Sequence, residues 1–349
     1  MLPCGTFSAR PEEDLAIVRT KTQWFLIAVG LAFFAALGLF APQDWVVWLI
    51  MLGIFAIAVL GLHILTGLCG QFSMGQAAFM AIGAYTAAVF GSRYGLSPWA
   101  TLPLAGIFAG LVGLLFGTPA LRIKGFYLVM STIAAQFIIR WVLLEGKTVT
   151  GGVFGIAVPA IKVGGEKLSD VQFWWLTLGL LVVMLILAKN IQRTATGRRF
   201  VAVRDNDLAA EVMGVNLFRT KLVAFFIGCF FAGIAGWLWA HFYTHITPDQ
   251  FTFQQSLIFL GMIIVGGMGS TTGAIFGATM LRLVEKGTTD HLSPVLKEAF
   301  PGLGVQFADS LTLIVFALVV MFFILVEPRG LYHRFQRLRL YYQLHPFAY

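Results

Sequence analysis

The side chains that catalysis requires are few in this chain of 349 residues and stand in unsuitable positions. Its six histidines form no pair with an intervening glutamate on one helix turn, and no Ser-His-Asp order or carboxylate pair falls on a plausible pocket wall. The triplet Gly146–Lys147–Thr148 resembles part of a phosphate loop, but Trp141 occupies the position where such a loop needs a glycine. We therefore expect no enzyme activity, no metal site and no cofactor on this chain.

The acidic residues discriminate between transport mechanisms. None of the 16 lies in the middle of an apolar segment, and Glu285 and Asp309 come closest, near segment ends. Proton-coupled carriers place a carboxylate at mid-membrane because protonation there changes the cost of burial. The pattern favours transport driven by another subunit, and a stand-alone secondary carrier or channel is the alternative.

Glycine and polar residues interrupt an apolar run at LTGLCGQFSMGQAAFMAIGAY, residues 65–85. Glycine breaks inside a membrane leave backbone groups unpaired unless they face protein or a watery cavity. A half-helix that starts near Ser73 would direct its amide groups into that cavity, which suits a carboxylate or amide substrate. The candidate pathway residues are Gln71, Ser73, Gly75 and Gln76, and close helix packing is the alternative.

Two further stretches carry candidate pathway residues. Thr132 and Gln136 lie about one helical turn apart in an apolar span, where they either line a path or bond back to their own helix. The stretch IVGGMGSTTGAIFGATM, residues 264–280, has a pattern of glycine and small residues similar to that of the first glycine break, and it adds Gly267 and Gly269 to the candidate pathway residues. We interpret it as a degenerate internal repeat, as transport folds often carry.

The most informative stretch is the basic loop TGRRFVAVRDNDLAAEVMGVNLFRTK, residues 196–221. Asp205 or Asn206 can cap a short helix there, and Gly214 can follow its C-cap. So short a helix is unstable alone in water, so we expect it to dock in a partner's groove, where alanines permit close approach. A membrane-surface helix is the alternative. The candidate coupling residues are Arg204, Asp205, Asn206, Asp207, Leu208, Ala209, Ala210, Glu211 and Gly214.

Ten apolar runs must position these residues. They are Trp24–Phe40, Trp45–Leu65, Gln76–Gly91, Pro98–Gly117, Gly125–Leu144, Val171–Ala188, Leu222–Ala240, Phe251–Gly267, Thr271–Lys286 and Asp309–Val326. The third, eighth and ninth are short and contain glycine, which indicates partial or tilted helices. We predict an all-α polytopic membrane protein with about ten transmembrane helices (eight to ten), some of them discontinuous.

Composition and charge support this prediction. The chain is 58% hydrophobic and 11% charged, with a mean hydropathy of +0.85, whereas soluble domains carry about 25% charged residues. Of its 24 Lys and Arg, 16 fall on segments placed inside by a cytoplasmic N-terminus, so the charge of +8 indicates topology rather than nucleic-acid binding. We predict a cytoplasmic tail (1–23), a transmembrane domain (24–326) with a periplasmic loop (145–170) and a coupling loop (189–221), and a second cytoplasmic tail (327–349).

The basic loop resembles the EAA-type coupling loop of ABC-importer permeases through Ala209, Ala210 and Gly214, although Leu208 stands in place of the usual glutamate, next to Asp207. Three other stretches resemble LivM-type permeases of branched-chain amino acid importers. They are GQFSMGQAAFMAIGAY, LRIKGFYLVMSTIAAQFIIR followed by TGG, and VEPRGLY. Together with GRRFVAVRDNDLAAEVMGVN, the resemblance extends from about residue 45 to 333.

This resemblance implies an ABC-importer permease fold in a bacterial or archaeal cell membrane. It implies a LivH-like second permease, two ATPase subunits that hold ATP and magnesium, and a periplasmic or lipid-anchored solute-binding protein, with no nucleic acid. Closure of the ATPases would be transmitted through Arg204–Gly214. Family members carry branched-chain amino acids, urea, short amides or aromatic acids, and their specificity lies largely in the binding protein.

Overall fold

Each of the ten predicted apolar runs is a helix in the computed structural model, which describes residues 21–120, 126–163, 166–292, 305–327 and 330–344. The all-α class is therefore confirmed, and of the predicted tail 1–23 only residues 21–23 are described. The long helices are α2 (Lys21–Phe40), α3 (Gln43–Leu62), α4 (Gln76–Arg93), α5 (Pro98–Ala120), α6 (Phe126–Glu145), α8 (Asp170–Arg193), α11 (Leu217–Tyr243), α12 (Phe253–Gly266), α13 (Thr271–Gly287) and α15 (Val305–Val326).

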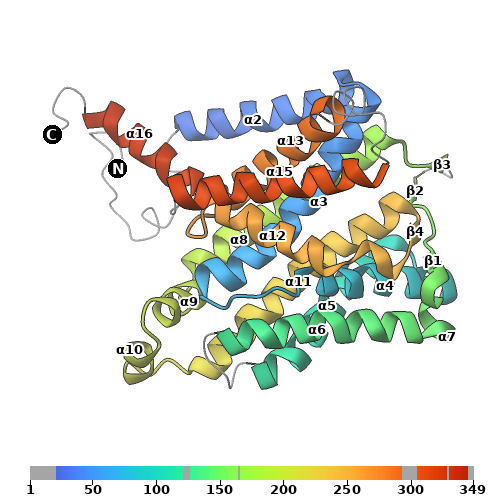
Figure 1. The fold of residues 1–349 in the computed structure, drawn as a ribbon, viewed down its shortest axis with the longest axis horizontal. Helices are drawn as coiled ribbons and strands as arrows, with labels where there is room; N and C mark the ends of the chain where they lie inside the picture. The colour runs from blue at the N-terminus through green and yellow to red at the C-terminus, as the bar shows by residue number, and fades with distance from the viewer. Residues whose placement is uncertain (1–20, 121–125, 164–165, 293–304, 328–329, 345–349) are drawn as a thin grey trace.

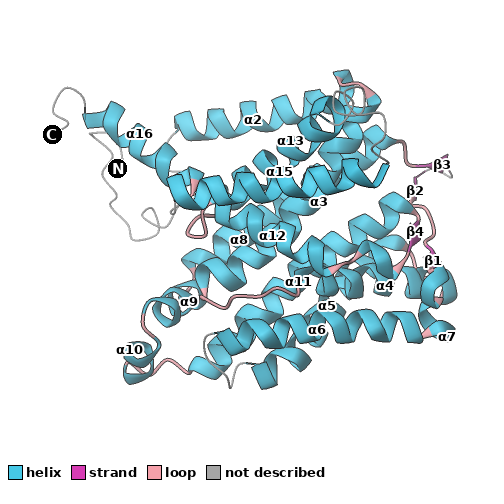
Figure 2. Cartoon of the chain, viewed as in Figure 1, coloured by secondary structure: helices cyan, strands magenta, loops and turns pink. Residues whose placement is uncertain are grey.

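The shorter elements lie at the two ends of the bundle (Figure 1). At one end are α9 (Ala195–Asp205), α10 (Asp207–Val212) and α16 (Leu331–Leu344), and we call it the α10 end. The other, the strand end, carries α7 (Lys147–Thr150), η2 (Gly152–Phe154), β1 (Ile156–Ala157), β2 (Lys162–Val163), β3 (Glu166–Lys167), β4 (His245–Ile246) and η3 (Pro248–Gln250). Figure 2 shows that the strands are confined to this end, where β1 pairs with β4 and β2 with β3, both antiparallel.

Five helices of the described residues are long and apolar enough to cross a membrane alone. They are α3 with its continuation η1 (His63–Leu68), α5, α6, α8 and α11. Helices α12 and α13 form a pair bent by 118° at a short break, and counting this pair and the α15–α16 pair as one span each raises the number to seven. The prediction that some helices are discontinuous is therefore confirmed.

The core forms around α3 and α11. The most apolar stretch of α3 is 89% buried and that of α11 is 72% buried, against 33–39% for α5, α6 and α8. Glycines on α5 face phenylalanines on α11, with Gly106 against Phe230 and Gly110 against Phe226. This fit lets the two helices pack closely, as small residues do in membrane proteins.

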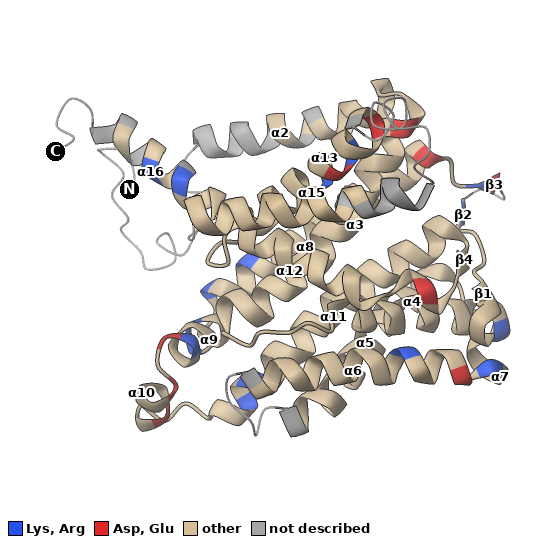
Figure 3. Ribbon diagram, in the orientation of Figure 1, with Lys and Arg blue, Asp and Glu red and all other residues tan. Residues whose placement is uncertain are grey.

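Charge is distributed unevenly along the bundle (Figure 3). Lys and Arg lie on α9, on α16 and at the end of α8, all at the α10 end, whereas most of the described Asp and Glu lie at the strand end. The first turn of α2 and the whole of α16 lie at the α10 end as well.

Candidate functional site

The candidate pathway begins where α3 ends and the chain turns back into the bundle. Helix α3 passes into the wider turn η1, and Gly70, with φ +71°, reverses the chain direction. Figure 1 shows the following segment in blue, running from beside α9 into the bundle to α4. We call residues 69–75 the re-entrant segment.

Helix α4 therefore starts in the interior of the bundle. The side chain of Gln76 donates from Nε2 to the carbonyl oxygen of Ala58 at 2.9 Å, and Ala58 lies ten residues before Leu68 on the preceding helix. Ten residues of helix span about 15 Å, so the first residue of α4 is that far from the end of η1. The predicted helix start near Ser73 is present, with its first residue at Gln76, although α4 has 18 residues and is longer than a half-helix.

Three side chains from other helices surround the first turn of α4. The amide of Ala77 donates to Ser256 Oγ at 2.9 Å, and the amide of Ala78 donates to Gln136 Oε1 at 2.9 Å. Thr132 Oγ1 accepts from the amide of Met74 at 3.1 Å. We call Thr132, Gln136 and Ser256 the polar junction, and all three are buried.

The polar junction is internally connected. Ser256 donates from Oγ to Gln136 Oε1 at 3.1 Å, and Gln136 donates from Nε2 to the carbonyl of Phe251 at 3.0 Å. Thr132 also donates to the carbonyl of Val129 on its own helix, which is the second of the two roles that the sequence left open. The bonds that Ser256 and Gln136 accept from Ala77 and Ala78 satisfy two of the amides that a helix start leaves unpaired.

The arrangement differs from the expectation that the start of α4 faces a cavity with free amides. The amides of Ala77 and Ala78 bond to side chains of this chain instead, because α6 and α12 place an amide and a hydroxyl beside them. Sequence reasoning missed Ser256, whose only signal is a hydroxyl within the apolar stretch FQQSLIFL. The role of the junction residues in solute passage stays a prediction.

The remaining candidates in the re-entrant segment bond locally. Gln71 donates from Nε2 to the carbonyl of Cys69 at 3.3 Å, and Ser73 Oγ accepts from the amide of Gly75 at 3.4 Å. A side chain at Gly75 would press on the carbonyl of Thr132, so glycine is needed for this close approach. The oxygen Oε1 of Gln76 is buried and has no hydrogen-bond partner.

Gly267 and Gly269 lie beside the base of the re-entrant segment, where a Cβ atom at Gly67 would clash with the carbonyl oxygen of Met268. They form the turn between α12 and α13, and a cavity of about 370 Å³ beside this turn is lined by both glycines and by Tyr332 and Gln336 of α16. Helix α12 starts next to the polar junction and spans about 21 Å over its 14 residues, so this turn lies about that far along the helix from the junction. The second break is a tight turn and does not repeat the re-entrant shape of the first.

The basic loop folds as the sequence predicts, into a short capped helix. The amide of Ala209 donates to Asn206 Oδ1 at 3.1 Å, which identifies Asn206 rather than Asp205 as the N-cap of α10. Gly214 follows with φ +84°, and the amide of Val215 donates back to the carbonyl of Ala210 at 2.9 Å. The helix has six residues.

The exposed face of α10 differs from the expected one. Ala210 is buried at 4% exposure, so it packs against its own chain rather than toward a partner. Leu208, Val212 and Met213 are instead exposed, at 65%, 87% and 83%. Exposed apolar side chains of this size on one short element indicate an interaction surface.

Arg204 joins this loop to the candidate pathway. Its Nη1 donates to the carbonyl of Gly67 at 2.9 Å, and its Nε donates to Asp205 Oδ1 at 2.9 Å. A Cβ atom at Gly70 would lie 3.0 Å from Cγ of Arg204, so the arginine also packs against the turn that starts the re-entrant segment. The two candidate sites that the sequence treats separately are therefore in contact.

The fold and these contacts define a polytopic helical membrane protein with a re-entrant segment coupled to an exposed loop helix. Residues 45–325 match the family described as branched-chain amino acid transport system / permease component, and the chain belongs to this family. It is similar to the high-affinity branched-chain amino acid transport system permease protein LivM of Escherichia coli (strain K12), with 36% identity over 253 residues, covering 65% of this chain and 60% of that protein.

Two further relatives are less similar to this chain. The probable branched-chain amino acid transport permease protein LivM of Methanocaldococcus jannaschii is 25% identical over 232 residues, covering 65% of this chain and 66% of that protein. The permease LivH of Escherichia coli (strain K12) is 30% identical over 140 residues, covering 40% of this chain and 42% of that protein. The matched region thus spans about 60% of the length of the Escherichia coli LivM protein, and no solved structure matches the chain.

Proposed function

We propose that this chain is a non-catalytic permease subunit of an ATP-driven importer, and that it translocates branched-chain amino acids across the cell membrane. The observation that carries the proposal is the bond from Arg204 to the carbonyl of Gly67, which connects an exposed loop helix to the re-entrant segment. Membership of the permease family and the names of the relatives support the solute class. ATP and magnesium bind to partner subunits and not to this chain.

The proposed partners follow from this assignment. A second permease similar to LivH pairs with this chain, two ATPase subunits bind at the α10 end, and a binding protein delivers the solute at the strand end. The cavity of about 440 Å³ between α9 and the start of α11, lined by Arg199, Met213 and Arg219, supports an ATPase contact beside α10. The basic residues of the α10 end support a cytoplasmic location for it and for both tails.

In the proposed mechanism, a displacement of the basic loop is transmitted to the candidate pathway. When the ATPases close, they move α10, and Arg204 carries this movement to Gly67 and Gly70 at the base of the re-entrant segment. Withdrawal of that segment would break the bonds from Ala77 and Ala78 to the polar junction. The amides released in this way become donors for a passing carboxylate, as expected for a helix start inside a membrane domain.

A stand-alone secondary carrier is the alternative function. None of the Asp and Glu residues in the described part of the chain is among its buried polar side chains. Burial of a carboxylate is the usual basis for coupling to protons. The acidic residues therefore support the importer over the carrier. Family relatives for urea, short amides or aromatic acids remain the alternative for the solute.

The test is isolation of the tagged chain from its native membrane followed by reconstitution in proteoliposomes. We expect two ATPases and a second permease to co-purify, and uptake of leucine to require ATP and the binding protein. Purification of the chain alone, together with leucine uptake in the absence of ATP, would replace the importer by the carrier. Uptake of urea or aromatic acids in place of leucine would retain the importer and change its solute.

A further inference from the structure

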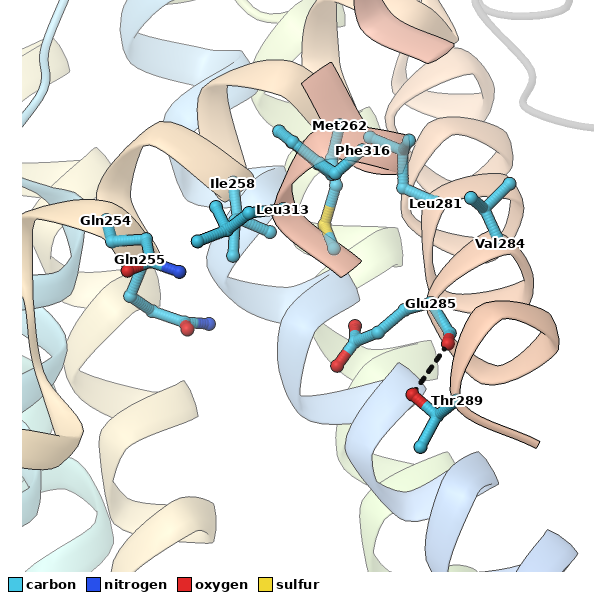
Figure 4. Close-up of a pocket in the computed structure, with 10 residues that line it drawn as sticks. All are labelled: Gln254, Gln255, Ile258, Met262, Leu281, Val284, Glu285, Thr289, Leu313 and Phe316. Atoms are coloured by element: carbon cyan, nitrogen blue, oxygen red, sulfur yellow. Dashed lines mark hydrogen bonds between the residues drawn. The ribbon is translucent and has the colours of Figure 1, made fainter. Parts of the chain in front are cut away.

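A third cavity lies among α12, α13 and α15, apart from the polar junction (Figure 4). Its volume is about 330 Å³, at the lower end of the range for small-molecule sites, which is about 300–1,000 Å³. One end is polar and contains Gln255, Glu285 and Thr289, and the other end is apolar and contains Met262, Leu281 and Phe316. The cavity is thus amphipathic along its length.

The polar end holds an unused hydrogen-bond donor. The nitrogen Nε2 of Gln255 is buried and has no hydrogen-bond partner. Buried amides without partners are rare because each costs free energy, so this one indicates that an acceptor is missing from the cavity. Figure 4 shows the side chains of Gln255 and Glu285 projecting toward each other across the polar end.

The opposite wall holds a carboxylate with spare capacity. Glu285 Oε2 accepts from Arg282 Nη1 at 2.6 Å, and the guanidinium of Arg282 lies 4.7 Å from the centre of the Phe55 ring. An ionised carboxylate offers about four acceptor positions, so Glu285 can bond a further donor. The Arg282–Glu285 pair is neutral overall, which disfavours a ligand of net positive or negative charge.

We propose that this cavity binds a zwitterionic amino acid with an aliphatic side chain. Glu285 accepts from the α-ammonium group, and Gln255 donates to the α-carboxylate. The aliphatic side chain packs against Met262, Leu281 and Phe316. The choice of an amino acid rests on the proposed function, whereas the site itself rests on the cavity and its polar and apolar ends.

Equilibrium binding of radiolabelled leucine to the purified full chain in lipid nanodiscs tests the proposal, without ATPases or binding protein. We expect saturable binding that Ile258→Trp weakens tenfold or more by filling the cavity, since Ile258 lines it. The matched control is Leu257→Trp, one position along the same helix, where the side chain is 39% exposed and does not line the cavity. The control is expected to bind leucine like the unaltered chain.

Two further measurements assign the polar contacts. Glu285→Gln is expected to weaken leucine binding about tenfold, the value of one charge-assisted hydrogen bond. The same substitution is expected to change the binding of 4-methylpentanoate less than threefold, because this ligand lacks the ammonium group that would bond Glu285. Because Glu285→Gln also removes the charge partner of Arg282, its thermal unfolding midpoint is compared with that of Ile258→Trp, which keeps the pair.

The outcomes separate this site from the proposed function. No leucine binding, or binding that Ile258→Trp and Glu285→Gln leave unchanged, would overturn the site even where the reconstituted complex takes up leucine. Binding that Ile258→Trp abolishes, in a chain whose complex imports no leucine, would support the site and overturn the proposed function. Equal weakening of leucine and 4-methylpentanoate by Glu285→Gln would overturn the assigned orientation.

Discussion

Replacement of Arg204 by alanine should uncouple ATP hydrolysis from transport. Its guanidinium donates to the carbonyl of Gly67, and its Cγ packs against Gly70. Through these contacts α9 reaches the base of the re-entrant segment. Alanine at this position leaves α10 and its cap intact, because Asn206 supplies the cap. We therefore expect the ATPases to bind and hydrolyse ATP while the movement of the loop no longer reaches the pathway.

The size of the effect follows from the geometry. A hydrogen bond from a charged group contributes about 1.5–3 kcal/mol. The side chain of Arg204 is 35% exposed, and solvent screening favours the lower end of that range, about 1.5 kcal/mol. Since each 1.4 kcal/mol corresponds to about a tenfold change, we expect the number of solute molecules moved per ATP to fall about tenfold.

The assay measures leucine uptake and phosphate release in the same proteoliposomes. The matched control is Arg198→Ala, an exposed arginine on the same helix whose described bond goes to the carbonyl of Arg193 nearby. Arg198→Ala is expected to leave the ratio of uptake to hydrolysis unchanged. An unchanged ratio in Arg204→Ala would refute the coupling route, and so would an equal loss in both variants.

Three further predictions concern stability and partner binding. Gln136→Leu should lower the free energy of unfolding by about 2–4 kcal/mol, because buried Ser256 Oγ loses its acceptor and the carbonyl of Phe251 loses its donor, and thermal unfolding in detergent measures this. Gly70→Ala should lower the free energy of unfolding by about 1–2 kcal/mol, because alanine is strained at φ +71°, and it should lower transport. An unchanged free energy of unfolding would contradict this strain. Val212→Asp should weaken ATPase co-purification about tenfold without altering unfolding, whereas Ala210→Leu, at a buried site, should lower stability. ATPase co-purification with Val212→Asp at the level of the unaltered chain would exclude the exposed face of α10 as the ATPase contact.

The helices and the local caps could be read from the sequence. Runs of about 20 apolar residues predict spans because a bilayer requires that length, and all ten runs are helical. The helix start expected near Ser73 is present at Gln76, but α4 has 18 residues and is longer than a half-helix. Asn206 and Gly214 act as cap and terminator of α10, because both roles depend on groups within one turn of the chain.

The polar junction shows where local reasoning fails. Gln136 and Ser256 bond to the first turn of α4 from positions 58 and 179 residues away in the chain. The spacing of Thr132 and Gln136 fits a polar path as well as an internal contact, since both require the same helix face. Only the placement of α6 and α12 beside α4 assigns these side chains to capping amides.

Composition, apolar periodicity and local capping residues by themselves determined the helical membrane class, the helix positions and the short helix of the basic loop. Tertiary structure alone decided that Ala210 is buried, that the turn of Gly267 and Gly269 contacts Gly67, and that Arg204 bonds Gly67. The physical reason is the separation along the chain over which each interaction acts, because propensities and caps act within a turn or two of the backbone. The pairing of distant polar groups depends on which helices become neighbours.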